Sequence, residues 1–146
     1  MASKTAQQLP VMTVQEPTRR LFRPEGWGVV EVEGVASAPE KSFEIELAEF
    51  LHDGESFVDG ETMLKRAEEM GDLVGELHAE WIWEGRDTIQ VEYRAFVLVI
   101  AGVVRSNPDG RRHVLCLYWC GDRWDSDWLW LEFDFNSNYR VVRLSK

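Results

Sequence analysis

The chain has 146 residues, of which 45% are hydrophobic, and a formal net charge of −10; this size and composition indicate one folded domain with a core of its own. No apolar run approaches the roughly 20 residues that cross a bilayer, and residues 1–20 lack the apolar centre of a signal peptide, so we expect a cytoplasmic protein without a membrane partner. An acidic protein repels phosphate groups, which argues against a nucleic-acid partner.

The negative charge is concentrated in one part of the chain. Residues 43–92 contain fifteen Asp or Glu and three Lys or Arg, whereas residues 106–146 contain six acidic and six basic residues. Such an acidic segment is typical of a solvated surface, and mimicry of nucleic acid is the alternative. The neutral C-terminal region has to be interpreted from its pattern of residue types instead.

The two cysteines, Cys116 and Cys120, are too few for a disulfide framework. Four residues apart on one strand, at about 3.3 Å per residue, they would be separated by roughly 13 Å, which is too far for a disulfide bond. Two thiolates also make a poor zinc site. We therefore expect free thiols in a reducing compartment, with no metal and no other cofactor.

The N-terminal part of the chain changes character near residue 25. Residues 1–25 are polar and contain three prolines and three arginines, which predicts a flexible N-terminal arm. Residues 26–146 are then a single domain. Its first two strands are expected within residues 26–35 (GWGVVEVEGV) and residues 42–50 (SFEIELAEF), where apolar residues alternate with glutamates.

The apolar pattern then takes a helical period. Asp59 is expected to cap a first helix that Gly71 ends, and Asp72 is expected to cap a second. The apolar positions of the first helix are Met63, Leu64, Ala67 and Met70. Those of the second helix are Leu73, Val74, Leu77, Trp81 and Ile82. Residues 77–83 (LHAEWIW) also alternate, so a strand is the alternative there, and we favour the helix.

The chain after Gly85 is rich in strand signals. One or two strands are predicted within residues 89–104, and further strands at residues 112–119, 123–131 and 139–144. Residues 107–110 (NPDG) are typical of a turn. Strands, two helices and then several antiparallel strands predict an α+β domain.

The C-terminal strands combine tryptophans with aspartates, and a period of two sorts them into two faces. One face carries large apolar residues, predicted to be mostly buried against the two helices: Leu115, Leu117, Trp119, Trp124, Trp128 and Trp130. The other carries residues without a common chemical theme, predicted to point outward: Cys116, Tyr118, Cys120, Asp125, Asp127 and Leu129. This is neither a uniformly charged surface nor an apolar interface.

Residues 117–144 (LYWCGDRWDSDWLWLEFDFNSNYRVVRL) resemble the C-terminal region of the variable proteins of diversity-generating retroelements. In that family a frame of the type L-W-G-RW-L-F-WL-D-W-S-RLVR recurs, with changing residues in between. The upstream segments GETMLKRAEEMG, HAEW and NPDG resemble the less variable body of those proteins, so the resemblance covers roughly residues 43–146. Ser126 and Tyr139 depart from the frame, which tends to have leucine and aspartate there.

The resemblance implies a C-type lectin-like fold, with two helices packed on small antiparallel sheets, and a non-enzymatic ligand-binding protein. A reverse transcriptase system would rewrite selected codons in the variable C-terminal region, residues 116–140, and so diversify a hypervariable ligand-binding face. Ten residues between the frame positions, called the variable positions below, are the candidates for that face: Tyr118, Cys120, Asp122, Asp125, Asp127, Leu129, Phe133, Asp134, Asn136 and Asn138.

Adenine-directed mutagenesis offers a check within the sequence. In such systems the target codons are mostly AAY, and randomising their first two bases never yields Trp, Met, Gln, Lys or Glu. All ten variable positions hold residues of the permitted set. The composition of these positions therefore supports the resemblance.

Catalysis has little support in the sequence. His78 and Glu80, at i and i+2 of a helix, do not face each other. His52 and His113 lack the spacing of a catalytic triad. We therefore expect no enzyme and no catalytic residues.

Metal and sugar binding are the remaining chemical alternatives. Asp122, Asp125 and Asp127 could bind calcium through carboxylate oxygens, but Asp125 and Asp127 would lie about 6.5 Å apart, and the glycine and distal glutamate of an EF-hand are absent. The tryptophans could stack on sugars, although their alternation with polar residues favours core packing.

The sequence thus predicts a binding protein whose ligand is an unspecified protein or other macromolecule. Its rivals are an acidic interaction or regulatory protein, and a small hydrolase or calcium-dependent lectin-like binder that uses the C-terminal acids.

Overall fold

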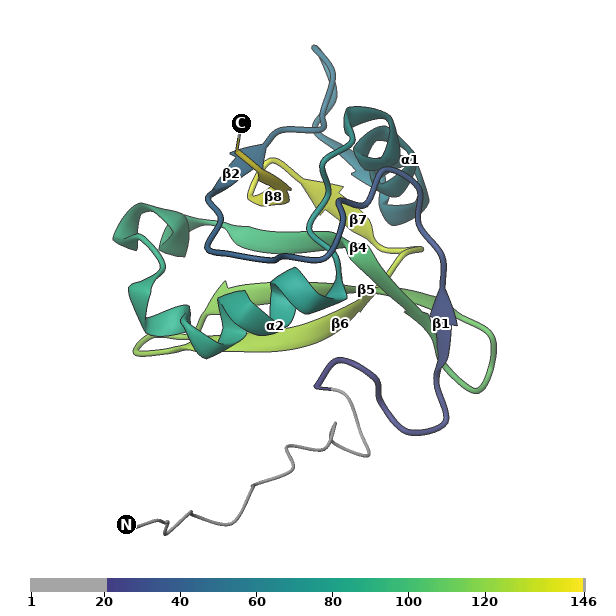
Figure 1. Cartoon of the computed structure of the whole chain (residues 1–146). Coiled ribbons are helices and arrows are strands. Elements are labelled where there is room, and N and C mark those ends of the chain that lie inside the picture. Colours follow the sequence, from purple (N-terminus) through teal and green to yellow (C-terminus); the bar gives the residue numbers. More distant parts are fainter. Residues whose placement is uncertain (1–20, 146) are drawn as a thin grey trace, which may run out of the picture.

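A computed structural model describes residues 21–145, and its main feature is a six-stranded sheet (Figure 1). The strand order is β2 (Ile45–Ala48), β8 (Tyr139–Leu144), β4 (Val97–Ser106), β5 (Arg112–Trp119) and β6 (Trp124–Trp130), with β1 (Gly28–Val30) also paired to β4. Neighbouring strands are antiparallel except β4 and β8, which are parallel. A second sheet pairs β3 (Phe57–Asp59) with β7 (Asp134–Asn136).

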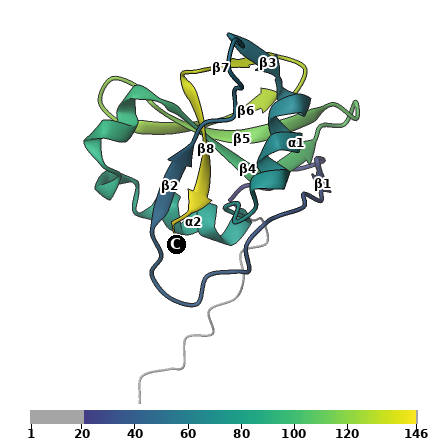
Figure 2. The ribbon, with the colours of Figure 1, turned by 90° about the horizontal axis from the view of Figure 1, so that it is seen from above.

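Both faces of the main sheet are buried. Along β4, Val99 and Ala101 belong to one core cluster, whereas Leu98 and Ile100 belong to another. The first cluster includes side chains of α1 (Gly60–Met70), and the second includes side chains of α2 (Glu76–Glu84). The two helices therefore cover opposite faces of the sheet (Figures 1 and 2). This double burial explains why β4 reads as a continuous apolar run.

Helix α1 forms as the sequence predicts. The Asp59 carboxylate accepts a hydrogen bond from the Thr62 amide at 2.8 Å, which satisfies a free donor of the first turn. The predicted apolar residues Met63, Leu64 and Ala67 are buried. The helix ends at Gly71, whose N–H donates to the Ala67 carbonyl.

Helix α2 begins later than predicted, because Asp72 does not cap it. Gly75 is the residue before the helix, and Asp72 has a positive φ of 54°. The main chain at residues 72–74 instead bonds to the sheet: Leu73 bridges to other segments, and the Val74 amide donates to Val142. The segment LHAEWIW is helical, which confirms the favoured interpretation.

A glycine allows this crossing of residues 72–74 over β4. Gly102 lies between Ile100 and Val104, where the pairing of β4 with β5 shifts register. A Cβ at Gly102 would lie 2.2 Å from the Val74 carbonyl oxygen. Only glycine therefore permits so close an approach of the two backbones.

The strands agree with the sequence best in the C-terminal half. Strands β5 and β8 have the predicted bounds, and β6 is one residue shorter at each end. The NPDG turn forms, with the Gly110 amide donating to the Asn107 carbonyl. Two 3₁₀ helices, η1 (Arg86–Thr88) and η2 (Val91–Ala95), follow α2, and η2 occupies residues expected to begin a strand. The short strands β3 and β7 were not predicted.

The packed domain begins before the predicted boundary at residue 25. Phe22 is buried beside Trp83, and its carbonyl accepts a hydrogen bond from Arg105. Arg23 pairs with Glu76 on α2. The rest of the predicted arm, residues 1–20, lies outside the described residues.

The α+β class is confirmed by the two helices and the mainly antiparallel sheets. No helix within residues 21–145 is both long enough and apolar enough to cross a membrane.

Candidate ligand-binding face

The β5–β6 hairpin displays the two faces predicted from the sequence. Tyr118 lies directly opposite Asp125, and Cys116 lies opposite Asp127, so these four residues share one face. The next residue along each strand belongs to the other face. The β5–β6 turn lies at the end of the sheet away from α1 (Figures 1 and 2), and we call this the hairpin end.

None of the ten variable positions is buried. Three of them, Tyr118, Asp125 and Leu129, are half-buried, and the remaining seven are exposed. The frame residues between them provide core side chains, and the buried ones are Leu117, Trp124, Leu131, Phe135, Val141 and Val142. Buried residues and more accessible residues are therefore interspersed through the C-terminal region, without a strict alternation.

The phenol of Tyr118 marks a group of variable positions at the hairpin end. Burial raises the pKa of Tyr118 above its ordinary value of 10.0, and the negative charges of Asp125 and Asp127 and the nearby Cys120 raise it further. Side chains that influence one another electrostatically in this way lie close together. Tyr118 therefore remains a neutral phenol at neutral pH, surrounded by acidic neighbours.

Asn138 joins this group from the β7–β8 connection. Its carbonyl accepts a hydrogen bond from the Val97 amide at the start of β4. Strands β4 and β8 are parallel, and Leu98 pairs with Leu117 near the end of β5. Residue 138 therefore lies at the hairpin end of the sheet.

Phe133 and Asp134 lie toward the start of α1 instead. The Phe133 carbonyl accepts a hydrogen bond from Gly60, and its ring packs on Trp130 with centroids 5.3 Å apart. Asp134 pairs with Asp59, the cap of α1. The variable positions thus run from the hairpin end, through Asn136 on β7, to the start of α1.

The face that carries the variable positions is covered along part of its length. Cys116 was predicted to point outward, but it is buried, and Leu129 packs against the same core cluster. The covering residues include Phe135 and Tyr139, whose rings are 5.0 Å apart. The outward prediction fails for Cys116 because β7 and α1 lie over this part of the sheet.

Asp125 and Asp127 have a local structural contact that the sequence analysis missed. Their carboxylates accept hydrogen bonds from the following backbone amides, Ser126 at 2.9 Å and Trp128 at 2.7 Å. Strand β6 is at the edge of the sheet, where free N–H groups invite pairing with another chain. The two aspartates occupy these donors and add charge to the edge. Side chains of this kind give no signal in a period-two pattern.

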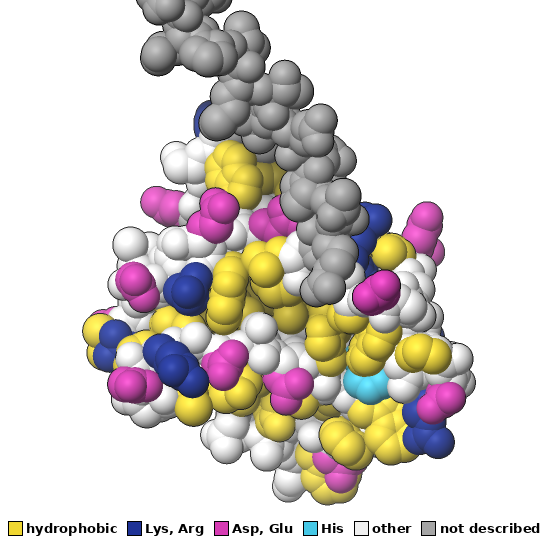
Figure 3. Space-filling model, turned by 90° about the horizontal axis from the view of Figure 1, so that it is seen from below, with side chains coloured by type: hydrophobic (Ala, Val, Ile, Leu, Met, Phe, Trp, Pro, Cys, Tyr) yellow, Lys and Arg dark blue, Asp and Glu magenta, His cyan; other side chains and the backbone are white. Residues whose placement is uncertain are grey.

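The tryptophans pack on the α2 side of the sheet rather than against both helices. Trp124 is 3% exposed, and Trp119 and Trp128 pack partly buried against the same cluster. Trp130 is also half-buried and packs on Phe133. Apolar side chains gather on the underside of the molecule, with charged side chains spread around them (Figure 3). The prediction of buried rings holds fully for Trp124 alone, because the short α2 covers only part of this face.

Arg94 packs on Trp119 at the hairpin end, on the opposite face from Tyr118, and the sequence analysis did not identify this contact. Its guanidinium lies over the Trp119 ring, 3.7 Å from the centroid. It belongs to η2, which packs against β5 near the hairpin end. Residues in a 3₁₀ helix follow neither the strand nor the α-helix period, so the sequence carried no pattern that could place Arg94 there.

The three histidines have surroundings without catalytic geometry. His78 is buried against Phe43, with ring centroids 4.8 Å apart, and burial lowers its pKa. His113 packs against Trp27 at 4.9 Å. His52 is exposed, and its backbone amide donates to Glu55. Within residues 21–145, no three or more His, Cys, Asp or Glu side chains are grouped so that they could hold a metal ion.

Comparison with known proteins yields no relative. The chain matches no protein-family model, and no curated protein or solved structure is significantly similar to it.

Proposed function

We propose that this chain is a non-enzymatic ligand-binding protein whose variable positions form a face diversified by a retroelement. The proposal joins the resemblance of residues 43–146 to retroelement variable proteins with the geometry of the C-terminal strands. It also includes a C-type lectin-like fold. Two helices packed on mainly antiparallel sheets are in keeping with that fold.

One observation carries the proposal: none of the ten variable positions is buried and seven are exposed, although they lie among residues that form the core. Leu129 is the member that packs against a core cluster. Exposed substitutions usually change stability by less than about 0.5 kcal/mol. Large-to-small changes in a core cost about 2–5 kcal/mol. A mutagenesis system confined to the variable positions would therefore change the surface repeatedly while leaving the folded scaffold intact.

The surface chemistry supports binding of a macromolecule. Tyr118 and Phe133 provide aromatic side chains, and Phe133 is 54% exposed. Aromatic side chains of this kind often anchor protein interfaces, because they bury a large area at a small cost in conformational entropy. The acidic side chains beside Tyr118 would add polar specificity, through hydrogen bonds to donors of the ligand.

The genomic neighbourhood tests the proposal. We expect a near-copy of the DNA that encodes residues 116–140, located beside a reverse transcriptase gene and differing from the coding copy mainly at adenines. Coding copies from independent isolates should differ at the variable positions and agree between them. The absence of a second copy, together with differences spread evenly over the region, would contradict the proposal.

A further inference from the structure

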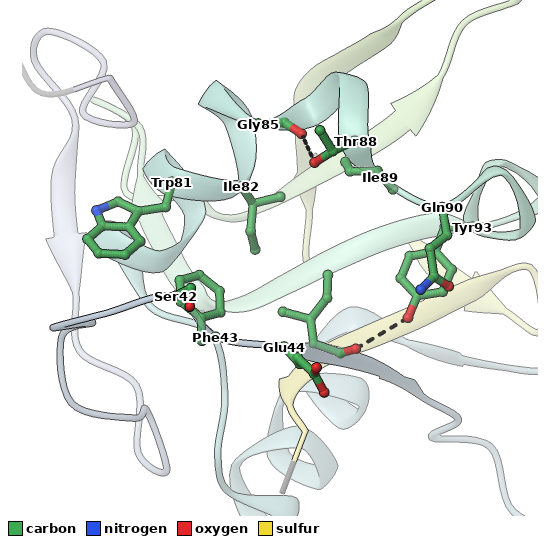
Figure 4. A pocket seen from close by; sticks show the side chains of 11 residues that line it. Ser42, Phe43, Glu44, Trp81, Ile82, Gly85, Thr88, Ile89, Gln90 and Tyr93 are labelled. Carbon is green, nitrogen blue, oxygen red and sulfur yellow. Dashed lines mark hydrogen bonds between the residues drawn. The ribbon is translucent and has the colours of Figure 1, made fainter.

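The structure contains a pocket of about 480 Å³ that lies apart from the variable positions. It opens between the end of α2, the two 3₁₀ helices and β2 (Figure 4). None of the ten variable positions lines it. We call it the β2 pocket, and its volume falls within the range of pockets that hold small ligands or large side chains.

Aromatic and aliphatic side chains form the walls of the β2 pocket. Trp81 is 42% exposed, and its ring lies 5.8 Å from that of Phe43. Ile82 and Ile89 line the pocket between the aromatic pair and Tyr93 (Figure 4). A tryptophan this exposed on a helix is an energetic cost in water that an apolar ligand group would relieve. The pocket therefore fits a large apolar side chain.

One wall of the pocket is the free edge of the main sheet. Among the strands of residues 21–145, β2 pairs with β8 alone. The Glu44 carbonyl points to the β8 side, where it accepts a hydrogen bond from Ser145, whereas the Ile45 carbonyl accepts one from the Tyr93 hydroxyl on the opposite side. The backbone N–H and C=O groups of Ile45 and Leu47 thus face away from β8. An extended peptide could pair with this edge while one side chain enters the pocket.

The two edges of the main sheet differ in how they are protected. On β6, Asp125 and Asp127 occupy outward backbone amides. Within the part of the chain that the structure describes, no carboxylate makes such a bond to the outer edge of β2. Strand addition would therefore have to displace two carboxylates on β6, whereas on β2 it would have to displace the Tyr93 hydroxyl from the Ile45 carbonyl.

The charge around the pocket selects the partner. Within residues 42–45 and 81–93, which include all the lining residues, Glu84, Asp87 and Glu92 add to the negative charge of Glu44, and Lys41 and Arg94 flank these two segments. Glu44 lines the pocket itself. The one base within the two segments, Arg86, is turned onto Trp83, 4.3 Å from the ring centroid, and donates to the Trp83 carbonyl. A partner with basic residues would be attracted to this edge.

We infer that the β2 pocket binds an extended basic segment of a partner protein. The segment adds to the free edge of β2 and places a large apolar side chain beside Trp81, with a Lys or Arg near Glu44. This binding is independent of the variable face, so it stays the same when that face is diversified. A constant attachment site of this kind would let the protein be held by one partner while its variable face meets another.

A peptide selection tests the inference. The full chain is used to select from a library of phage-displayed random peptides, and the enriched peptides are synthesised and titrated by calorimetry. We expect enriched peptides in which a large apolar residue neighbours Lys or Arg. Binding should slow amide hydrogen exchange at Ile45 and Leu47, and leave the β5–β6 hairpin unchanged.

Matched variants separate the pocket from the variable face. Trp81→Ala and Glu44→Lys should each weaken peptide binding at least tenfold. Glu132→Lys, the same charge change at an exposed residue outside the pocket, and Asp127→Ser on the variable face should bind as the unmodified chain does. Both pocket residues are exposed, so these variants should fold, and their circular dichroism spectra check this.

Four outcomes would overturn the inference. They are the absence of any enriched peptide, binding that Asp127→Ser removes and Trp81→Ala does not, unchanged exchange at Ile45 and Leu47, and dimerisation through the pocket. Binding of a synthetic peptide with the sequence of residues 1–20 would assign the pocket to this chain's own segment and would also contradict a separate partner. The genomic result described above does not affect any of them.

Discussion

Trp124 and Asp127 lie three residues apart on β6, but one is buried and the other is exposed. Trp124 is 3% exposed and packs in the core cluster on the α2 side. Asp127 is exposed, and its carboxylate accepts a hydrogen bond from the next backbone amide. The loss in free energy of unfolding when each residue is replaced should therefore differ by several kcal/mol, although the two residues belong to the same strand.

Replacing Trp124 and Asp127 separately measures this difference. Trp124→Ala should lower the free energy of unfolding by about 3–5 kcal/mol, because it leaves a cavity in the core. Asp127→Ser should change it by less than about 0.5 kcal/mol, because water replaces the lost hydrogen bond at the exposed edge. Urea denaturation of both variants gives the two values, and equal losses would refute the separation of scaffold from variable face.

Trp124→Phe refines the same experiment. The buried indole N–H of Trp124 has no hydrogen-bond partner among the described residues. Phenylalanine removes this unpaired donor while it keeps an aromatic ring in the core. Trp124→Phe should therefore destabilise the protein clearly less than Trp124→Ala does.

Glu55 should contribute to the acid sensitivity of the fold. The Arg66 guanidinium, which donates to its carboxylate at 2.6 and 3.0 Å, and the His52 amide lower the pKa of Glu55 from 4.5 to about 2. A carboxyl group with a depressed folded-state pKa stabilises the protein above its unfolded pKa, and this contribution is lost as the pH falls toward the folded value. The affected window therefore lies between 4.5 and about 2.

A Glu55→Gln variant tests this contribution. Its free energy of unfolding should fall less steeply than that of the unmodified chain as the pH is lowered through the window. Asp59, whose pKa is lowered by its bonds to Thr62, retains part of the acid sensitivity in the variant. Urea unfolding at several pH values gives the free energy of unfolding against pH for the variant and for the unmodified chain. Parallel curves would show that Glu55 does not contribute to the acid sensitivity.

The sequence predicted burial at single residues only where local alternation decides it. Tyr118 and Trp119 lie on opposite faces, as a strand requires. The same rule placed Cys116 outside, and there it was wrong. Whether a sheet face is covered depends on α1 and β7, which come from distant parts of the chain, and alternation along β5 contains no information about them.

Secondary-structure elements were predictable where end signals agree with the period. Helix α1 has both a capping aspartate and a terminal glycine, and it forms within them. Asp72 is the same kind of residue at the second helix, yet tertiary bonds of Leu73 and Val74 to the sheet take the place of a first helical turn. Strands β3 and β7 have three residues each and pair across much of the chain, so neither had a local pattern long enough to show.

Gly102 allows a test of how the elements fit together. Gly102→Ala places a methyl group 2.2 Å from the Val74 carbonyl oxygen, so one of two buried backbone segments must move. We expect a loss of about 1–3 kcal/mol or more, as in overpacked cores. Gly85→Ala is the control, because its Cβ would make ordinary contacts at 3.6 Å and its φ of −95° suits alanine. Thermal unfolding of the two variants compares them, and equal melting temperatures would show that residues 72–74 do not need this close approach.

At the scale of the whole molecule, the two proposed binding surfaces lie at opposite edges of the main sheet. Strands β5 and β6 form one side of the main sheet, and the variable positions run from their hairpin end across β7. The β2 pocket lies at the opposite edge strand, beside α2. A sheet buried on both faces holds the two surfaces at a fixed separation, so ligand binding at one need not disturb the other.

Calcium distinguishes the binding protein from its lectin-like rival at this scale. If the C-terminal acids serve the variable face, millimolar calcium should leave the melting temperature unchanged. A ligand present at about 100 times its dissociation constant would add roughly 2.7 kcal/mol to stability. A rise of several degrees in the presence of calcium, with magnesium as the control ion, would favour the calcium-dependent alternative.

The central claim is that the fold tolerates change at the variable positions and not between them, and a comparison of two libraries measures this directly. One library randomises the ten variable positions. The other randomises ten residues that alternate with them: Leu117, Trp119, Trp124, Ser126, Trp128, Trp130, Leu131, Phe135, Tyr139 and Val141. Resistance to proteolysis on the cell surface, scored by sequencing, gives the folded fraction of each library. We predict that most members of the first library and few of the second remain folded; similar folded fractions in both would contradict the account.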